Sequence, residues 1–354
     1  METYRPRARG VTIEDVARAA GVSRQTISNA LNAPHRLKAE TLERVTALIE
    51  QLGYRPDQSA RSLRSGARRI IAYPTPEDDP ANPNPLMGGF LEAVVSAAGE
   101  AGYHILLVRP NPEQEQTRAL DELIAARTVD GFLLSDVLPD DARVRHLARQ
   151  GIPFAAFGRT APDQPQNWVD VDTVQAVNDL VGLLAAAGHQ RIAFLASASD
   201  LPWMGHRRDG FHSGVRRHGL RGREISVPGD EPGAIVEVTR RLLRGPDRPT
   251  AVVAASDWLA LGVYAAARAE GLDIGADLAV TGFHDMPVTA RLEPALTTVR
   301  LPLRRIADVL VRRLLRTVKD GVVPQAGVLL PCEIVVRASS GECAPLVERS
   351  YDSI

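Results

Sequence analysis

Five polar side chains that can hydrogen-bond to nucleic acid bases fall within six consecutive residues: Arg24, Gln25, Thr26, Ser28 and Asn29. Arginine can donate two parallel hydrogen bonds to a guanine, and glutamine or asparagine can pair in the same way with an adenine. Each good pair discriminates against a wrong base by ~1–3 kcal/mol. These residues, called the polar set below, suit sequence recognition if one helix presents them on the same face.

The residues before the polar set predict a helix followed by a tight turn. Thr12 and Asp15 have the spacing of a capping box, and apolar residues follow at helical intervals over 13–20. Gly21 interrupts this pattern, and Ser23 is a suitable N-cap for a second helix. A short helix, a glycine turn and a second short helix are therefore expected.

The second helix is expected to turn its apolar residues inward and the polar set outward. Ile27, Ala30 and Leu31 lie on its inner face. This arrangement is the helix-turn-helix pattern, whose second helix lies in the major groove. An ordinary helical hairpin with a solvated face is the alternative for these residues taken alone. A third helix with one apolar face is predicted over 39–52.

A basic segment follows over 54–69. A short helix in it would carry Ala60 and Leu63 on one side and Arg61 on the other. One exposed leucine among arginines suits a minor-groove element, because an apolar wedge can part a base step and kink the duplex. The alternative is a flexible linker rich in arginine and serine.

Charge is distributed unevenly along the 354 residues, although the net charge is -1. Residues 1–69 hold 13 Arg and Lys against 7 Asp and Glu, whereas the rest of the chain holds 29 against 36. A basic head on an acidic body indicates a polyanion-binding module joined to a different module. The two cysteines exclude a disulfide scaffold. With no visible secretory signal and no apolar run of about 18 residues, we expect a cytoplasmic protein without a membrane segment.

The stretch VTIEDVARAAGVSRQTISNALN, followed by ETLERV, LGYRP and SARSL, resembles the DNA-binding head and hinge of LacI-type transcription regulators, the lactose-repressor and purine-repressor family. The resemblance implies that Arg24 and Gln25 are the main base-reading residues and that Leu63 is an intercalating leucine. Lys38-Ala39 replaces the family's small-polar/proline pair and weakens the start signal of the third helix. The DNA contacts expected on this basis are Thr12, Ser23, Arg24, Gln25, Thr26, Ser28, Asn29, Asn32, Tyr54, Ala60, Arg61 and Leu63.

From residue 70 the pattern changes to short apolar runs that alternate with amphipathic helical stretches. Such alternation predicts an α/β fold with parallel sheets and right-handed crossovers, and the number of runs suits two sheets. Ligands in such folds bind outside the carboxyl ends of the strands. The runs expected to be buried strands are 69–73, 103–108, 130–135, 152–158, 191–196, 250–256 and 278–283.

The resemblance to the LacI-type family continues in NPLMGGFLEAV, VDGFLL, GHQRIAFL, RRDGF, SDWLALGVYAAARAEGL and PALTTVRLPL, which look like its effector-binding core. That core is similar to periplasmic binding proteins, with two doubly wound parallel-sheet subdomains joined by three crossings. The resemblance implies an all-α helix-turn-helix domain over 1–56, a hinge helix over 57–69 and a core over 70–345. Subdomain one would span about 70–189 and 298–326, and subdomain two about 190–297 and 327–345. The crossings would lie near Gly188-His189, Leu296-Thr297 and Ala326.

Matching positions in this core give a candidate effector pocket. Arg207 matches the family's ligand-clamping arginine, whose fork suits hydroxyls or a carboxylate. Leu86, Thr173 and His284 depart from the family, and His284 replaces a carboxylate that commonly holds sugar hydroxyls. Trp203 and Trp258 suit stacking on a sugar ring, with packing as the alternative. The expected effector-binding residues are Leu86, Arg159, Asp172, Trp203, Arg207, Asp257, Trp258 and His284.

Enzymatic chemistry has weaker signals. Glu77, Asp78 and Asp79 form an acidic run that could serve glycoside hydrolysis, but a proline-rich solvated loop explains it more simply. Histidines at 206, 212 and 218 recur every six residues, a spacing that scatters them around a helix and makes them poor metal ligands. No phosphate-binding or nucleophile-elbow motif is present. We therefore expect no catalytic residue, metal or cofactor.

The sequence thus predicts a DNA-binding transcriptional regulator, a repressor controlled by a small-molecule effector, most simply a carbohydrate. It would bind a pseudo-palindromic double-stranded operator as a homodimer, because the tail is too short for the leucine-heptad helix of the family's tetramers. The competing hypothesis is a sugar-binding or sugar-processing protein without DNA binding. Salt-dependent retention on DNA would separate the two.

Overall fold

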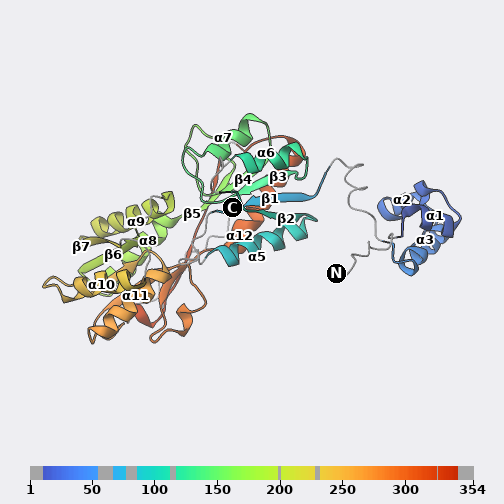
Figure 1. Ribbon diagram of the computed structural model, residues 1–354. Helices are drawn as coiled ribbons and strands as arrows, with labels where there is room; N and C mark the ends of the chain where they lie inside the picture. Colours follow the sequence, from blue (N-terminus) through green and yellow to red (C-terminus); the bar gives the residue numbers. More distant parts are fainter. Residues whose placement is uncertain are drawn as a thin grey trace, which may run out of the picture. The chain divides into compact units, whose positions relative to one another are not determined.

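The chain forms two compact units, a head over residues 1–69 and a body over residues 70–354 (Figure 1). The computed structural model describes residues 11–54, 67–76, 86–111, 117–197, 201–227, 232–324 and 326–341. The hinge residues Ala60, Arg61 and Leu63 and the acidic run over 77–79 lie outside the described residues. Within the described part of the chain, no helix is both long enough and apolar enough to span a membrane.

The described part of the head is a small helical domain around one apolar core. Its helices are α1 (Ile13–Ala20), α2 (Arg24–Asn32) and α3 (Ala39–Gln51), with the 3-10 turn η1 (Pro34–Arg36) between the last two. The buried core residues are Val16, Ala17, Ala20, Ile27 and Val45. These positions have the helical spacing predicted from the sequence, so each helix buries one apolar stripe.

Local capping chemistry sets where these helices begin. The Thr12 side chain accepts from the backbone N–H of Asp15 while the Asp15 carboxylate accepts from the backbone N–H of Thr12, which confirms the predicted capping box. Ser23 Oγ accepts from the backbone N–H of Thr26 at 3.1 Å. Gly21 ends α1 with φ +62°, a left-handed conformation that favours glycine. Lys38 precedes α3 without a side-chain cap, because its ammonium group has no acceptor.

The body contains two six-stranded sheets among its described residues. The first sheet has the order β11-β5-β4-β3-β1-β2, and its recorded strand pairs are parallel. Its strand β1, next to the edge strand β2, is buried on both faces, as expected for a parallel sheet covered by helices. The strands are β1 (Ile70–Pro74), β2 (His104–Val108), β3 (Gly131–Leu134), β4 (Phe154–Phe157), β5 (Trp168–Val171) and β11 (Val328–Leu330).

The second sheet has the order β12-β10-β9-β8-β6-β7. It is parallel except at one edge, where β12 pairs antiparallel with β10. Its strands are β6 (Arg191–Ser197), β7 (Arg221–Val227), β8 (Ala251–Ala254), β9 (Ala279–Phe283), β10 (Thr297–Arg300) and β12 (Glu333–Val335).

Each sheet is covered by its own helices (Figure 1). Helices α5 (Met87–Glu100), α6 (Arg118–Ala125), α7 (Ala142–Arg149) and α12 (Leu303–Asp320) pack on the first sheet. Helices α8 (Thr173–Ala186), α9 (Pro202–His218), α10 (Pro232–Arg244) and α11 (Asp257–Ala269) pack on the second. The predicted architecture of two doubly wound subdomains is therefore present.

The three crossings between the subdomains fall at other residues than the sequence predicted. Helix α8 packs on α9 and contacts β8 and β12, so the chain leaves the first subdomain at Asp172 and not near Gly188. Because β10 pairs with β9, the return follows Arg300. Because β11 pairs with β5, the last crossing falls between Leu330 and Glu333. Helical periodicity shows which face of α8 is apolar but not which sheet receives it, which explains the largest error.

The crossings bring the carboxyl ends of both sheets to the part of the body where the chain passes between them. At the first and third crossings, the backbone N–H of Asp172 donates to the carbonyl of Leu330 at 2.8 Å. At the second crossing, Arg300 ends β10 and α12 begins three residues later. Ligand-binding side chains are expected at these strand ends.

Candidate nucleic-acid interface and candidate ligand site

Helix α2 presents most of the polar set to solvent. The side chains of Arg24 and Gln25 are exposed, whereas Thr26 and Asn29 are half-buried. Gln25 Nε2 donates to Asn29 Oδ1 at 3.0 Å, so these two amide side chains are held together one turn apart on α2. The hydroxyls of Ser23 and Thr26 lie 2.9 Å apart at the start of the helix. The surface that results carries both hydrogen-bond donors and acceptors, as base edges require.

Arg24 also contacts the first helix. Its Nη1 lies 3.0 Å from Glu14 Oε1 of α1, and both side chains are 59% exposed. The expected main base-reading arginine is therefore paired with a carboxylate in the head without DNA. Glu14 was not predicted from the sequence, because it lies on the other helix and makes this contact only in the folded head.

One residue of the polar set does not face outward. Ser28 is only 6% exposed, so the expectation that it points to solvent is wrong. It follows Ile27 and precedes Leu31 by one helical turn, and this position turns it toward the core of the head. A serine is small enough to be accommodated there, and it is not available to a base in this conformation.

The other expected DNA contacts of the head have structural partners as well. Thr12 forms the capping box, with its hydroxyl 2.6 Å from Asp15 Oδ2. Tyr54 packs against the head's core, and its backbone N–H donates to Ile49. Asn32 is the last residue of α2. Thr12 and Tyr54 are thus placed by the fold of the head, and their contacts with DNA stay predictions.

The candidate ligand site centres on Arg207 of α9, whose side chain is almost fully buried, with 4% of the residue exposed. Its guanidinium carbon lies 3.9 Å from the centre of the Phe283 ring and 4.6 Å from that of Trp203. Nη1 donates to the backbone carbonyl of Ala255, and Nη2 lies 2.9 Å from His284 Nε2. Burial lowers the pKa of Arg207 to about 9, so the group is still a cation at neutral pH.

His284 follows β9 and meets Arg207 across this site. Burial, and then the neighbouring Arg207 cation, lower the pKa of His284 well below its ordinary value. Its φ angle is +115° and that of Asp285 is +54°, both in the left-handed region that favours glycine. Two such residues in succession mark a strained turn, and strained turns are found mostly at functional sites.

Asp257 supports this turn through its buried carboxylate. Its side chain is fully buried, Thr298 Oγ1 donates to Oδ1 at 2.6 Å, and the backbone N–H of Met286 donates to Oδ2 at 2.7 Å. Burial raises the pKa of Asp257. The expected contact of Asp257 with an effector is therefore not supported, because both oxygens face protein donors inside the fold. Its role is to position the turn that carries His284.

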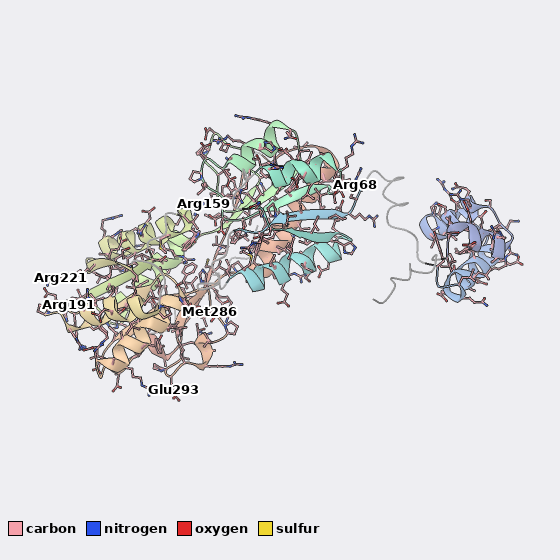
Figure 2. All side chains as sticks on the ribbon, viewed as in Figure 1. Arg68, Arg159, Arg191, Arg221, Met286 and Glu293 are labelled. Carbon is pink, nitrogen blue, oxygen red and sulfur yellow. The ribbon has the colours of Figure 1, made fainter. Side chains whose placement is uncertain are left out.

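The first subdomain contributes an ion pair near Arg207. Arg159 follows β4, and its Nε donates to Asp170 Oδ2 of β5 at 2.6 Å. Figure 2 labels Arg159 at the end of its strand, and Met286 on the second subdomain. Arg159 Nη2 lies 3.4 Å from His206 Nδ1, one residue before Arg207 on α9. Arg159 of the first subdomain is thus linked through His206 to the helix that carries Arg207.

The remaining expected residues have mixed environments. Asp172 caps α8 by accepting from the backbone N–H of Gln175 at 3.0 Å, so it holds the first crossing. Trp203 is half-buried beside Arg207, and its ring supports the expectation of an aromatic wall. Leu86 and Trp258 are half-buried against the main apolar core of the body. For these two residues, packing against the core is enough to explain the position of the side chain.

Two neighbours of Arg159 were not expected at the site from the sequence. Asp170 was not considered, and His206 was considered only as a metal ligand, although both contact Arg159. Cys332 of the third crossing lies near Arg207, and burial raises the pKa of its thiol to about 12. The position of Asp170 near a strand end was an available signal, whereas Cys332 required knowledge of where the last crossing falls.

No group of three or more metal-ligating side chains occurs within the described residues. His206, His212 and His218 all lie on α9, and the ring nitrogens of the first two contact Arg159 and Glu224. The rings of His206 and His212 therefore contact different residues.

Comparison with known proteins identifies the family. Residues 12–57 match the family described as bacterial regulatory proteins, lacI family, and residues 181–340 match a periplasmic binding protein-like domain. The regulator AglR of Rhizobium meliloti is 32% identical over 353 residues, which cover 96% of each chain. The chain belongs to the lacI family of bacterial regulatory proteins. The repressor CytR of Escherichia coli is 29% identical to this lacI-family chain over 334 residues, 93% of this chain and 96% of CytR.

Solved structures of lacI-family members are similar over nearly the whole chain. The lac repressor dimer bound to operator and the anti-inducer ONPF has a TM-score of 0.77 at 27% identity, covering 94% of this chain and 100% of that one. The CelR–cellobiose complex has a TM-score of 0.67 at 28% identity, covering 93% and 99%. This lacI-family protein is a DNA-binding transcriptional regulator and not an enzyme. The competing hypothesis of a sugar protein without DNA binding is overturned by the match at residues 12–57.

Proposed function

We propose that this lacI-family regulator is a cytoplasmic repressor whose affinity for its operator is set by a small-molecule effector at the Arg207 site. The observation that carries this proposal is the buried guanidinium of Arg207, which lies between the Phe283 and Trp203 rings. Aromatic faces bind the apolar face of a sugar ring, and guanidinium N–H groups bind its oxygens. A carbohydrate or a related metabolite is therefore the ligand class we propose.

The ligands of similar solved structures support this class. The CelR structure contains cellobiose, and the lac repressor structure contains the anti-inducer ONPF. Both proteins have the fold described here for this chain. The effector would enter where the strands of the two sheets end, which is where doubly wound folds hold ligands.

On the DNA side, we propose a homodimer whose two α2 helices bind the half-sites of a pseudo-palindromic operator. The lac repressor structure is a dimer bound to operator, and dimeric helix-turn-helix proteins place their half-sites about one helical turn apart or a multiple of it. Light scattering should give a mass close to two chains of 38.3 kDa. A monomer or a tetramer at micromolar concentration would contradict this assembly.

Effector and operator would be coupled through the three crossings of the body. A ligand that prefers one relative arrangement of the two sheets shifts the population toward it by its differential affinity alone. The sequence connection over 57–69 would pass this change to the DNA-binding head. An effector that releases DNA and one that promotes DNA binding are both consistent with this coupling.

The test uses the full chain. DNA sequences bound by the protein are first selected from a random pool, and operator affinity is then measured by fluorescence anisotropy over a range of salt. A steep salt dependence is expected, because each phosphate contact releases a counterion. A panel of sugars and metabolites is next tested for a change in operator affinity. If none changes it and none raises the melting temperature, the effector proposal is wrong.

A further inference from the structure

The Arg207 site has a cation but no anion to pair with it. Among the described residues Arg207 makes no ion pair, and its two recorded acceptors, the Ala255 carbonyl and His284 Nε2, are both uncharged. Burying a charge is costly unless an opposite charge or several hydrogen bonds compensate for it. At 4% exposure the guanidinium is also shielded from water. The site is therefore deficient in negative charge.

The tautomer of His284 adds a second unmatched donor. A guanidinium has only N–H donors, so His284 Nε2 must be the acceptor in its contact with Arg207 Nη2. The ring proton therefore lies on Nδ1. Both His284 Nδ1 and Arg207 Nε are buried without a hydrogen-bond partner. The Thr281 hydroxyl, from the same strand end as His284, is the third buried polar atom of the described residues without a partner. Two of these three atoms are N–H donors that require an acceptor.

Nearby acids do not supply this acceptor. Asp257 receives hydrogen bonds from Thr298 and from the backbone of Met286 and lies outside ion-pair distance of Arg207. Asp170 is paired with Arg159 at 2.6 Å. The thiol of Cys332 stays protonated at neutral pH, because burial raises its pKa to about 12. The neighbouring acceptors are thus engaged or uncharged.

We propose that the effector carries an anionic group, a carboxylate or a phosphate, that accepts hydrogen bonds from Arg207 and His284. This inference rests on the proposed function and specifies the ligand: an acidic or phosphorylated carbohydrate or related metabolite in place of a neutral sugar. Arg207 Nε and His284 Nδ1 are both enclosed, so the ligand reaches them only when the site opens, and we expect the turn at His284 and Asp285 to move. The Trp203 ring beside the guanidinium takes the apolar face of the same ligand.

The experiment compares matched sets of three ligands on the full-length protein by calorimetry and thermal shift. Each set holds a neutral sugar, its uronate and its 6-phosphate, for example glucose, glucuronate and glucose 6-phosphate. Inorganic phosphate and acetate are tested alone. We expect at least one acidic member to bind on the order of tenfold more tightly than its neutral parent, because hydrogen bonds to charged groups are stronger. Preference for uronates or for phosphates identifies which anion the site takes.

Two variants test whether Arg207 and His284 cause the preference for the acidic ligand. Arg207→Met keeps the length of the side chain but removes the charge, and it should abolish the advantage of the acidic ligand. His284→Asp places a carboxylate beside Arg207, and it should lower affinity for the acid while raising affinity for the neutral sugar. Arg240→Met, on the far end of α10 where Arg240 pairs with Glu270, is the matched control and should change neither.

The outcomes distinguish the inference of an anionic ligand from the proposed effector function. A neutral sugar that binds the wild type as tightly as its acidic partners would overturn the anionic inference and leave the proposed effector function intact. Unchanged acid preference in His284→Asp would overturn it too, even if Arg207→Met fails to fold. If no member of any set binds, the proposed function and this inference both fail.

Discussion

Arg24 of α2 and Glu14 of α1 form an ion pair, with 3.0 Å between Nη1 and Oε1, on the exposed side of the head. To fork onto a base, the arginine must leave this carboxylate. An exposed pair of this kind contributes ~0–1 kcal/mol, so the exchange is accessible in solution. Glu14 thus restrains the residue that is expected to select the base.

We therefore expect Glu14→Gln to increase affinity for DNA of any sequence by a few fold. The substitution removes a negative charge near the phosphates and frees Arg24 for them. Discrimination between the selected operator and random DNA should change little, since Arg24 has to leave Glu14 in either complex. Anisotropy titrations with both DNAs measure the two effects. Glu43→Gln, an exposed carboxylate of α3, is the control; a similar result for both variants would show that only net charge matters.

Arg24→Ala tests base reading directly. We expect loss of ~1–3 kcal/mol of discrimination at one position of each half-site, because a bidentate contact to one base is removed. Selection of bound sequences from a random pool, for the wild type and the variant, would show relaxed preference at that position. Preference that is unchanged at every position would mean that Arg24 contacts only phosphates.

Two glycines of α9 provide a matched test of how the second subdomain is packed. A Cβ on Gly210 would lie 2.6 Å from the Val174 carbonyl oxygen and 2.9 Å from Val177 Cβ of α8, whereas a Cβ on Gly205 meets no atom within 4 Å. We expect Gly210→Ala to destabilise the body by ~1–3 kcal/mol through overpacking. Gly205→Ala should be neutral or stabilise by about 0.5–1 kcal/mol, because alanine favours helix. Melting temperatures of both variants give the answer, and equal shifts would contradict the close contact of α8 with α9.

The buried Asp257 predicts a pH-dependent contribution to stability. Burial raises its pKa in the folded body above the ordinary 3.8, so the folded state holds this proton to higher pH than the unfolded state does. Stability from this group is therefore highest below pH 4 and is lost as pH rises through the folded pKa. Asp257→Asn removes the titration and leaves one acceptor oxygen for two donors, the Met286 N–H and the Thr298 hydroxyl. It should destabilise the body by ~1–3 kcal/mol near neutral pH.

Unfolding by denaturant at several pH values separates the two effects of Asp257→Asn. The difference in stability between wild type and variant should be larger near pH 4 than near pH 7. A difference that is constant over this range would mean that Asp257 does not titrate between them. A variant as stable as the wild type would contradict its role in supporting the turn that carries His284.

Much of the head is determined by its local sequence. Thr12, Asp15, Gly21 and Ser23 set the helix boundaries through hydrogen bonds and backbone conformations that span only a few residues. Apolar spacing then specifies which face of each helix is buried. Ser28 is the exception, because its burial depends on how closely α2 packs in the head.

In the body, the strand and helix order and the position of Arg207 also follow from the sequence and its family. The crossings do not, because an apolar helix face such as that of α8 fits either sheet, and three-residue strands such as β11 carry little pattern. The pairing of Arg24 with Glu14, the saturation of Asp257 and the unmatched donors of Arg207 and His284 were decided only by tertiary structure. Each depends on groups from separate elements, and the distances between such groups are set by packing and not by spacing along the chain.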